Sequence, residues 1–250
     1  MSVGLSNASV VVSIVSHGHG LMVQKLLHQL ALQKPQRATR VVVTHNINES
    51  ALVPPADGWP FAFQTIVNSQ PQGFGANHNQ ALNDAIEEWV CILNPDVELI
   101  EGEEDLLGKM LSTPDAHEAG CIYPVQINQA GKVQESEREL LTPWALLRRR
   151  AFHKTQRKRD WVNGAFLLIP SKRWHAIQGF DARYFMYCED VDLCLRLQLS
   201  GWGLLRSNAC VIHEGQRASG RQWRHLLWHL RSLGRLWLSS PFWRYLMQHS

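Results

Sequence analysis

The chain has 250 residues, 45% of them hydrophobic and 19% charged, which suits one large globular domain or two closely fused lobes with an ample core. Lys and Arg total 25 against 22 Asp and Glu, so the net charge of +3 excludes a uniformly cationic protein. The five cysteines are scattered without CxxC spacing, which predicts buried thiols in a reducing compartment and argues against a zinc site.

The positive charge is concentrated in two segments. Arg148 to Arg159 contains seven Lys and Arg residues and no acid, and Arg221 to Ser250 contains five arginines, four tryptophans and no acid. Two local basic surfaces are therefore expected. The N-terminus lacks the features of a signal peptide, and no run of about 18 apolar residues occurs. We expect a cytoplasmic protein, or one that lies on the inner face of the cytoplasmic membrane.

The first hundred residues alternate strand and helix patterns. Val10 to Val15 is a β-branched run, a helical pattern spans Leu21 to Leu32, and "RVVVTHN" and "FAFQTIVN" are two further strand candidates. The glycine-bearing "PQGFGANHNQAL" leads into a helix expected to reach Trp89, and "WVCILNPDVEL" forms the fourth run. This alternation predicts an α/β protein whose sheet is largely parallel.

Polar residues follow each of these runs. They are Ser16 and His17, His45 and Asn46, Gly73 to Asn79, and Asn94 to Asp96. Ligands of parallel α/β sheets bind beyond the carboxyl ends of the strands, so these clusters are candidate ligand contacts. The glycines of "GFGANHN" match neither the P-loop nor the dinucleotide fingerprint. His17 and His19 are interpreted as a polar loop, with metal binding as the minor alternative.

The second half is less regular. Glu101 to Ser112 is predicted as a helix, "GCIYPV" as a strand, and the stretch to Leu141 as a polar loop. "WVNGAFLLIPS" is predicted as one strand with a glycine inside it, and "NACVIHEG" as another strand. No internal repeat and no Gly/Ser/Pro linker separates the two halves.

The stretch "YFMYCEDVDLCLRL" combines aromatic residues, three carboxylates and a leucine-rich segment. Its hydrophobic residues alternate as in a strand, but Leu, Arg and Gln favour a helix, and acids at the start and Gly201 at the end suit helix termini. We predict a helix. The acids then either match the helix dipole or include a general base whose pKa the aromatic residues raise.

Asp96 and His213 are candidate metal ligands. Asn94-Pro95-Asp96 follows a buried strand, so Asp96 either completes a turn or binds a divalent cation, and the two roles are compatible. His213 ends the "NACVIH" strand and serves either as a structural hydrogen-bonding residue or as a ligand.

The C-terminal segment has an amphipathic pattern. Apolar residues recur at helical spacing, at Trp223, Leu226, Leu227, Leu230, Leu233 and Trp237. Arginines occupy much of the other face. A basic, tryptophan-bearing helix of this kind lies on an anionic membrane surface or docks on the core of its own domain.

Several blocks, in this order, resemble the family 2 glycosyltransferases, particularly their bacterial rhamnosyltransferase-like branch. They are "QGFGANHNQAL", "ILNPDVEL", "GAFLLI", "GFDARYFMY", "EDVDLCLRL" and "VIHEG". The resemblance runs from about Val10 to the tail. It implies the GT-A fold, a single Rossmann-like mixed sheet flanked by helices, with a C-terminal amphipathic helical tail. Residues 1–100 would form the nucleotide-sugar-binding half, 101–215 the acceptor-binding and catalytic half, and 216–250 the basic tail.

The resemblance also implies roles for particular residues. Asp190 would be the general base, Glu189 would orient the acceptor or the base, and Asp96 with His213 would hold Mg²⁺ or Mn²⁺. The nucleotide would be surrounded by Ser16, Asn46, Gly73, Phe74, Asn77 and Asn94.

Two departures from the family pattern matter. His45-Asn46 stands where the family usually has Asp-Asn, which leaves the recognition of the base open, and Asn94-Pro95-Asp96 offers only one acid for the metal. The implied activity is an inverting transfer from dTDP-rhamnose to a saccharide acceptor, lipid-linked, in cell-surface polysaccharide or lipopolysaccharide assembly. The alternatives are a non-catalytic glycan- or nucleotide-binding module and a sugar-1-phosphate nucleotidyltransferase. No nucleic-acid-binding motif occurs, so nucleic acid is not expected as a partner.

Overall fold

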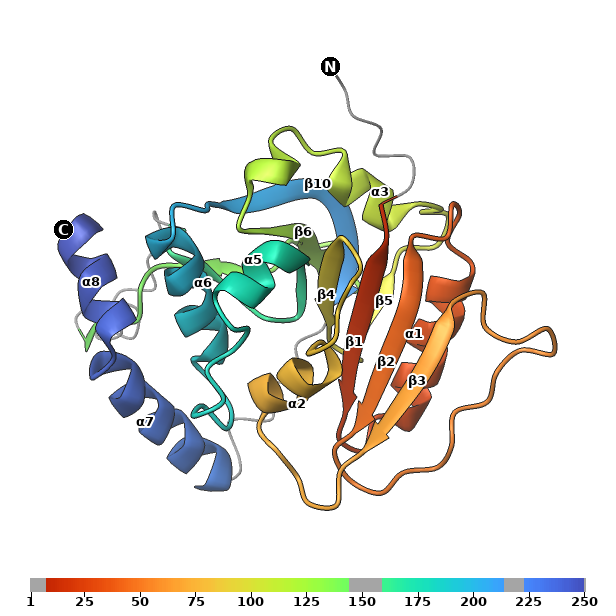
Figure 1. Ribbon diagram of the computed structural model, residues 1–250, viewed down its shortest axis with the longest axis horizontal. Coiled ribbons are helices and arrows are strands. Elements are labelled where there is room, and N and C mark those ends of the chain that lie inside the picture. The colour runs from red at the N-terminus through yellow and green to blue at the C-terminus, as the bar shows by residue number, and fades with distance from the viewer. Residues whose placement is uncertain (1–7, 144–158, 214–222, 250) are drawn as a thin grey trace.

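The structure is a computed structural model that describes residues 8–143, 159–213 and 223–249. One mixed sheet of eight strands crosses the molecule in the order β3-β2-β1-β4-β9-β6-β10-β5, with helices on both faces (Figure 1). Its strands are β1 (Val10–Ser16), β2 (Ala38–His45), β3 (Ala62–Val67), β4 (Trp89–Leu93), β5 (Val97–Leu99), β6 (Cys121–Ile127), β9 (Phe166–Pro170) and β10 (Leu204–His213). Two short strands, β7 (Glu137–Arg138) and β8 (Trp161–Val162), form a separate antiparallel pair.

Seven α-helices and one 3-10 helix accompany the sheets within the described ranges. They are α1 (Gly20–Ala31), α2 (Phe74–Ala81), α3 (Leu106–Leu111), η2 (Ala116–Glu118), α5 (Ser171–Ala176), α6 (Glu189–Leu199), α7 (Trp223–Trp237) and α8 (Ser240–His249). None of these helices is long and apolar enough to cross a membrane.

The first four strands of the sheet order are parallel, as the alternating pattern predicts. β1 pairs in parallel with β2 and β4, and β2 with β3. β9 then runs antiparallel to both β4 and β6, while β10 is parallel to β6 and antiparallel to β5. Since β9 starts where β4 ends, residues just before β9 reach the sheet edge at which the parallel strands terminate. This reversal brings the second half of the chain to the ligand-binding edge of the first half.

Two hydrophobic cores cover the two faces of the sheet. Alternate residues of β1 divide between them, because successive strand side chains point to opposite faces: Val10, Val12 and Ile14 join one core and Val11 the other. The first core includes residues of α1 and α3, and the second includes residues of α2, α6, α7 and α8. In Figure 1, α7 and α8 lie beside α6, at the end of the molecule opposite β3.

Several predicted boundaries were wrong. The helix expected to reach Trp89 ends at Ala81, because Trp89 is the buried first residue of β4. The helix expected from Glu101 is only the six residues of α3, for which Asp105 is the N-cap: its side chain accepts a hydrogen bond from Gly108 N.

Other segments also differ from the sequence prediction. "WVNGAFLLIPS" contains two strands, β8 and β9, separated by residues 163–165, and the polar loop before Leu141 contains β7. The fourth run is broken by a turn at Asn94 to Val97, after which β5 pairs with β10. The helical pattern from Trp223 to Trp237 is confirmed as α7, and a second helix, α8, follows it.

Candidate active site

Asp96 lies in a tight turn at the end of the buried strand β4. Asn94 N donates a hydrogen bond to Ala165 O at 2.8 Å, and Val97 N donates to Asn94 O at 3.2 Å. The turn interpretation of Asn94-Pro95-Asp96 is therefore confirmed. His213 is paired with Val97 in the β5–β10 ladder, which brings its ring to Asp96: Nε2 lies 3.5 Å from Asp96 Oδ2.

One carboxylate oxygen of Asp96 is left without a partner in the described part of the protein. This oxygen, Oδ1, is buried, and buried carboxylate oxygens are costly to leave unpaired. Within the described ranges no cluster of three His, Cys, Asp or Glu side chains can hold a metal ion, so Asp96 and His213 are a two-residue donor set. Two protein ligands suit a divalent cation whose other positions are filled by phosphate oxygens and water. The residues thus fit Mg²⁺ or Mn²⁺ bound together with a diphosphate.

The second acidic site is at the start of α6, which is a helix, as predicted. Tyr187 and Cys188 precede it with φ of 72° and 63°, in the left-handed region that non-glycine residues rarely adopt. Two consecutive residues in this conformation are held there only by the surrounding structure, and such strain is concentrated at functional sites. In the first turn of α6 that follows, the side chain of Asp190 reaches Gly164, between β8 and β9.

Glu189 and Asp190 have different surroundings. Glu189 is 7% exposed and its Oε2 has no hydrogen-bond partner, so burial, together with the charge of Asp190, raises the pKa of Glu189 well above its usual range. Asp190 is only partly buried. Burial raises the pKa of Asp190 as well, but Val191 N and Gly164 N donate to its two oxygens at 2.9 and 3.3 Å and favour its ionised form. Asp190 is therefore the acid of this pair that is better suited to accept a proton.

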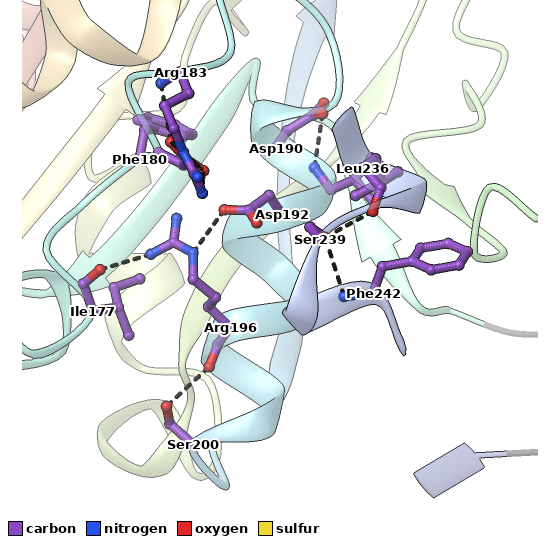
Figure 2. A network of polar contacts seen from close by, with 12 residues as sticks. Ile177, Phe180, Arg183, Asp190, Asp192, Arg196, Ser200, Leu236, Ser239 and Phe242 are labelled. Carbon is purple, nitrogen blue, oxygen red and sulfur yellow. Dashed lines mark hydrogen bonds and ion pairs between the residues drawn. The ribbon is translucent and has the colours of Figure 1, made fainter. Parts of the chain in front are cut away.

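Asp192, the third acid, has a structural role. It is 1% exposed, and its Oδ2 accepts a hydrogen bond from Arg196 Nε at 2.7 Å, one helical turn further along α6. Figure 2 shows Asp190 and Asp192 leaving α6 in different directions, with Asp192 pointing toward Arg196. Arg196 also donates to Ile177 O at 2.7 Å, which ties α6 to the end of α5. The acid cluster therefore combines a candidate base with a helix-anchoring ion pair.

The turn at residues 163–165 connects the two acidic sites. Ala165 O accepts the hydrogen bond from Asn94 at the Asp96 turn, and Gly164 N donates to Asp190. Asp96 and Asp190, 94 positions apart in the sequence, consequently lie at the same edge of the sheet, where β4 ends and β9 begins.

The "GFGANHN" loop meets the aromatic stretch before α6. Phe74 N donates to Phe185 O at 2.9 Å, and a Cβ at Gly73 would lie 2.8 Å from the same oxygen. Only glycine allows this close approach of two backbones. The Phe74 ring also packs edge-on against Phe180, and both Phe74 and Asp190 lie next to Gly164. The predicted nucleotide-binding loop is therefore in direct contact with the segment that carries the candidate base.

Asn46 and Asn77, which the resemblance assigns to nucleotide binding, belong to a buried amide cluster. Asn46 Oδ1 accepts from Asn68 Nδ2 and Gln72 N at 2.9 and 2.8 Å, and Asn77 Oδ1 accepts from Asn68 Nδ2 at 2.6 Å. The side-chain amides of Asn46 and Asn77 both donate to Gln72 O. These hydrogen bonds fix the shape of the loop that leads into α2.

Glu49 is a candidate site residue that the sequence pattern does not reveal. Its carboxylate lies at the ends of β1 and β2, where it accepts hydrogen bonds from Ser16 Oγ at 2.8 Å and Gly18 N at 3.0 Å. It is also 3.8 Å from the Nδ1 of His45, the residue that stands where the family usually has Asp. Burial opposes ionisation, but these hydrogen bonds outweigh it and lower the pKa of Glu49. A carboxylate is thus present at this position although the sequence motif lacks one.

Helix α7 packs against the segment before α6. Tyr187 OH lies 2.8 Å from His225 Nδ1, and Ser232 Oγ donates to Met186 O at 2.8 Å. The rings of Phe185 and Trp228 are in contact, with centroids 5.0 Å apart. One face of α7 therefore holds the strained residues that precede the candidate base.

No protein-family model matches the chain. It is 27% identical over 247 residues to the rhamnosyltransferase WbbL of Escherichia coli, covering 89% of this chain and 90% of that protein. It is 28% identical over 197 residues to the N-acetylglucosaminyl-diphospho-decaprenol L-rhamnosyltransferase of Mycobacterium tuberculosis, covering 70% of this chain and 63% of that protein. The structure also matches a mannosyltransferase of Pyrobaculum calidifontis, solved with GDP-Man and Mn²⁺, with a TM-score of 0.60 and 15% identity over 92% of this chain and 65% of that one. The predicted GT-A fold is confirmed.

Proposed function

We propose that this chain, a rhamnosyltransferase-like protein of glycosyltransferase family 2, transfers a sugar from a nucleotide donor to a saccharide acceptor in the assembly of cell-wall polysaccharide or lipopolysaccharide. The finer proposal is an inverting transfer from dTDP-rhamnose to a lipid-linked saccharide. It is supported by the likeness to two rhamnosyltransferases, the second of which is named for a diphospho-decaprenol-linked N-acetylglucosamine.

One observation carries the proposal: a carboxylate suited to accept a proton and a carboxylate suited to hold a cation lie at the same edge of the sheet. Asp190 accepts the proton of the acceptor hydroxyl as the acceptor oxygen attacks the anomeric carbon from the side opposite the diphosphate. The bond between the anomeric carbon and the diphosphate oxygen breaks, and the nucleoside diphosphate leaves. General-base assistance of this kind contributes about 10²–10⁴-fold in rate.

Asp96 and His213 are the residues that would hold the divalent cation. Bound together with the donor, the cation would neutralise charge that develops on the diphosphate leaving group, a contribution of several kcal/mol. The unpartnered Oδ1 of Asp96 supports this assignment. Residues 1–100 supply Asp96 and the Gly73–Phe74 loop for the donor, and residues 101–215 supply Asp190 for the acceptor.

The test is a transfer assay with purified full chain, Mn²⁺ and a panel of nucleotide sugars, against an acceptor with N-acetylglucosamine on a polyprenyl diphosphate. We expect product with dTDP-rhamnose and loss of turnover on chelation. Turnover that is insensitive to chelators would remove the metal from the proposal. A failure of all nucleotide sugars to react, with the fold intact, would favour the non-catalytic module.

The C-terminal helices support a further part of the proposal, contact with an anionic membrane. Leu233 and Leu236 of α7 are buried in the domain core, so docking on the chain's own domain accounts for part of the apolar pattern. The remainder forms an exposed stripe at helical spacing that consists of Trp223, Leu226, Leu227 and Leu230. Arg231 and Arg244 are exposed on α7 and α8. An apolar stripe accompanied by arginines fits the inner surface of the cytoplasmic membrane, where the lipid acceptor would be found.

Vesicle co-sedimentation tests this contact. We expect the full chain to bind vesicles that contain anionic lipid, and the double variant Leu227→Glu, Leu230→Glu to lose most of this binding. Ile86→Glu is the matched control, since Ile86 is 94% exposed and lies outside the C-terminal helices. Equal binding by both variants would remove α7 from the proposal. The basic cluster at residues 148–158 lies outside the described residues, whereas Arg159 forms an ion pair with Glu137 at 2.7 Å.

A further inference from the structure

A pair of side-chain amides, one buried and one partly buried, lies between the two acidic sites. Gln126, on β6, is 1% exposed, and Asn163 is in the turn between β8 and β9. The two amides bond reciprocally: Gln126 Nε2 donates to Asn163 Oδ1 at 2.7 Å, and Asn163 Nδ2 donates to Gln126 Oε1 at 3.0 Å. Gln126 Oε1 is also 2.9 Å from His213 Nδ1. The pair therefore touches the ring of the candidate metal ligand.

The orientation of both amides follows from one backbone contact. Amide oxygen and nitrogen have similar shapes, so the assignment must come from the hydrogen-bond network. Ala165 N donates to Asn163 Oδ1 at 3.3 Å, and a backbone N–H can only donate. Asn163 Oδ1 is therefore the atom that faces Ala165. The atom of Gln126 that bonds to this oxygen must be the amide nitrogen, so Gln126 Oε1 must face His213.

This orientation determines which nitrogen of His213 carries a proton. A carbonyl oxygen only accepts hydrogen bonds, so His213 Nδ1 must be the donor at 2.9 Å. A neutral imidazole then has its lone pair on Nε2, and Nε2 is the atom 3.5 Å from Asp96 Oδ2. Two hydrogen-bond acceptors facing each other require a proton or a metal ion between them. The unpartnered Asp96 Oδ1 at the same place favours the metal ion.

We propose that Gln126 and Asn163 are positioning residues that fix His213 in the tautomer required to bind the cation. Neither touches the substrate; they act through the ring, as carboxylates and carbonyls do for metal-binding histidines in other proteins. The inference rests on the metal site of the proposed function. It adds two residues to which the resemblance assigns no role.

The test compares two substitutions at Gln126 by their effect on Mn²⁺ affinity, measured by titration of Mn²⁺ into the full chain, alone and with dTDP. Gln126→Leu removes the acceptor of the His213 proton, and we expect affinity to fall about 10–100-fold, the usual effect of losing such a partner. Gln126→Glu keeps an acceptor for that proton, and we expect affinity within a few-fold of the original. A residue that is merely structural would give the opposite order, because Glu introduces a buried charge and loses the donor to Asn163. Equal effects of the two variants, or no effect of either, would overturn the proposal.

Two controls separate this inference from the metal site itself. Gln33→Leu removes another buried amide whose oxygen and nitrogen both bond to backbone groups, and it should destabilise the fold without changing Mn²⁺ affinity. Asp96→Asn should abolish Mn²⁺ binding. If Asp96→Asn abolishes Mn²⁺ binding but Gln126→Leu does not weaken it, the metal site stands and only the positioning role fails. If Asp96→Asn binds Mn²⁺ as the original chain does, the metal site is wrong and so is this inference.

Nitrogen-15 NMR of the histidine rings gives a readout that does not depend on turnover. The signal of His213 is identified by its absence from the spectrum of a His213→Gln variant. In metal-free protein at alkaline pH, where imidazoles are neutral, we expect the His213 ring to be protonated at Nδ1. In Gln126→Leu we expect the proton on Nε2, where it donates to Asp96. An Nε2-protonated ring in the unsubstituted protein would contradict the proposal.

Discussion

The two acidic sites of this protein are held in place by different means. Asp96 follows a buried strand in an ordinary turn, and its neighbour His213 is set by a ladder of strand hydrogen bonds. Asp190 follows two residues in left-handed backbone conformation, Tyr187 and Cys188, and the stretch before it is held by side chains of α7. The cation side, Asp96 and His213, therefore depends on the sheet. The base side, Asp190 and the residues just before it, depends on packing by α7, a distant part of the chain. Variants should separate the two sides.

The largest effect confined to the base side is expected from Asp190→Asn, which is compared with Glu189→Gln at the neighbouring residue. Asparagine cannot accept the acceptor proton, so kcat should fall by about 10²–10⁴-fold while Mn²⁺ affinity is unchanged. Glutamine resembles the neutral Glu189 that burial favours, so Glu189→Gln should cost far less. Transfer assays on both variants, with circular dichroism as a check on folding, make the measurement. Equal losses in the two variants would mean that the pair acts as a unit rather than through Asp190.

Gly73→Ala should disturb the contact between the donor loop and the segment before α6. A Cβ at Gly73 would lie 2.8 Å from Phe185 O, so one backbone must shift, at a cost of about 1–3 kcal/mol. We expect a lower free energy of unfolding together with a lower kcat/KM. Gly203→Ala is the control, because nothing lies within 4 Å of a Cβ added there. Comparable effects at both glycines would contradict the importance of the close approach.

The sequence predicts the sheet better than it predicts the site. Strands β1, β2 and β4 are β-branched or apolar runs whose burial dictates their form, and chain topology alone brings Ser16, Asn46 and Asp96 to one edge. Pattern and resemblance together predict Asp96 and His213 as metal ligands, and in the structure His213 Nε2 lies 3.5 Å from Asp96 Oδ2.

Residues whose role depends on partners far away in the sequence escape such reasoning. Glu49 reaches Ser16 through a loop without a regular pattern. Gln126 and Asn163 become significant only when β6 and the turn before β9 place them side by side. The sequence predicts the amphipathic tail, but its pattern does not divide the apolar face between core and solvent. In the structure Leu233 is buried in the core and Leu227 is exposed, a division that depends on where α7 docks.

Tyr187→Phe tests whether α7 supports the base side alone. The change removes the contact of Tyr187 OH with His225 Nδ1 at 2.8 Å, worth about 0.5–1.5 kcal/mol, and leaves the aromatic ring in place. We expect a modest fall in kcat and stability with Mn²⁺ affinity unchanged. Tyr245→Phe is the control, since its hydroxyl donates hydrogen bonds to Asp160 and Gln198 instead of contacting α7. A fall in Mn²⁺ affinity in Tyr187→Phe would show that the two sides are not independent.

The smallest effect expected is on stability, through the protonation of Glu189. Burial raises the pKa of Glu189 in the folded protein. At pH values between the ordinary carboxyl pKa and this raised pKa, the folded state therefore keeps a proton on Glu189 that the unfolded state has lost. The folded state is then penalised as pH rises through this window, and the penalty is absent below the ordinary carboxyl pKa. Glu189→Gln removes the titrating group, so it should raise the free energy of unfolding at pH 7 and make no difference near pH 4. Urea unfolding at the two pH values measures this. A variant that is less stable at pH 7 would mean that the Glu189 carboxylate is ionised and satisfied in the fold, and the division of roles between it and Asp190 would have to be reversed.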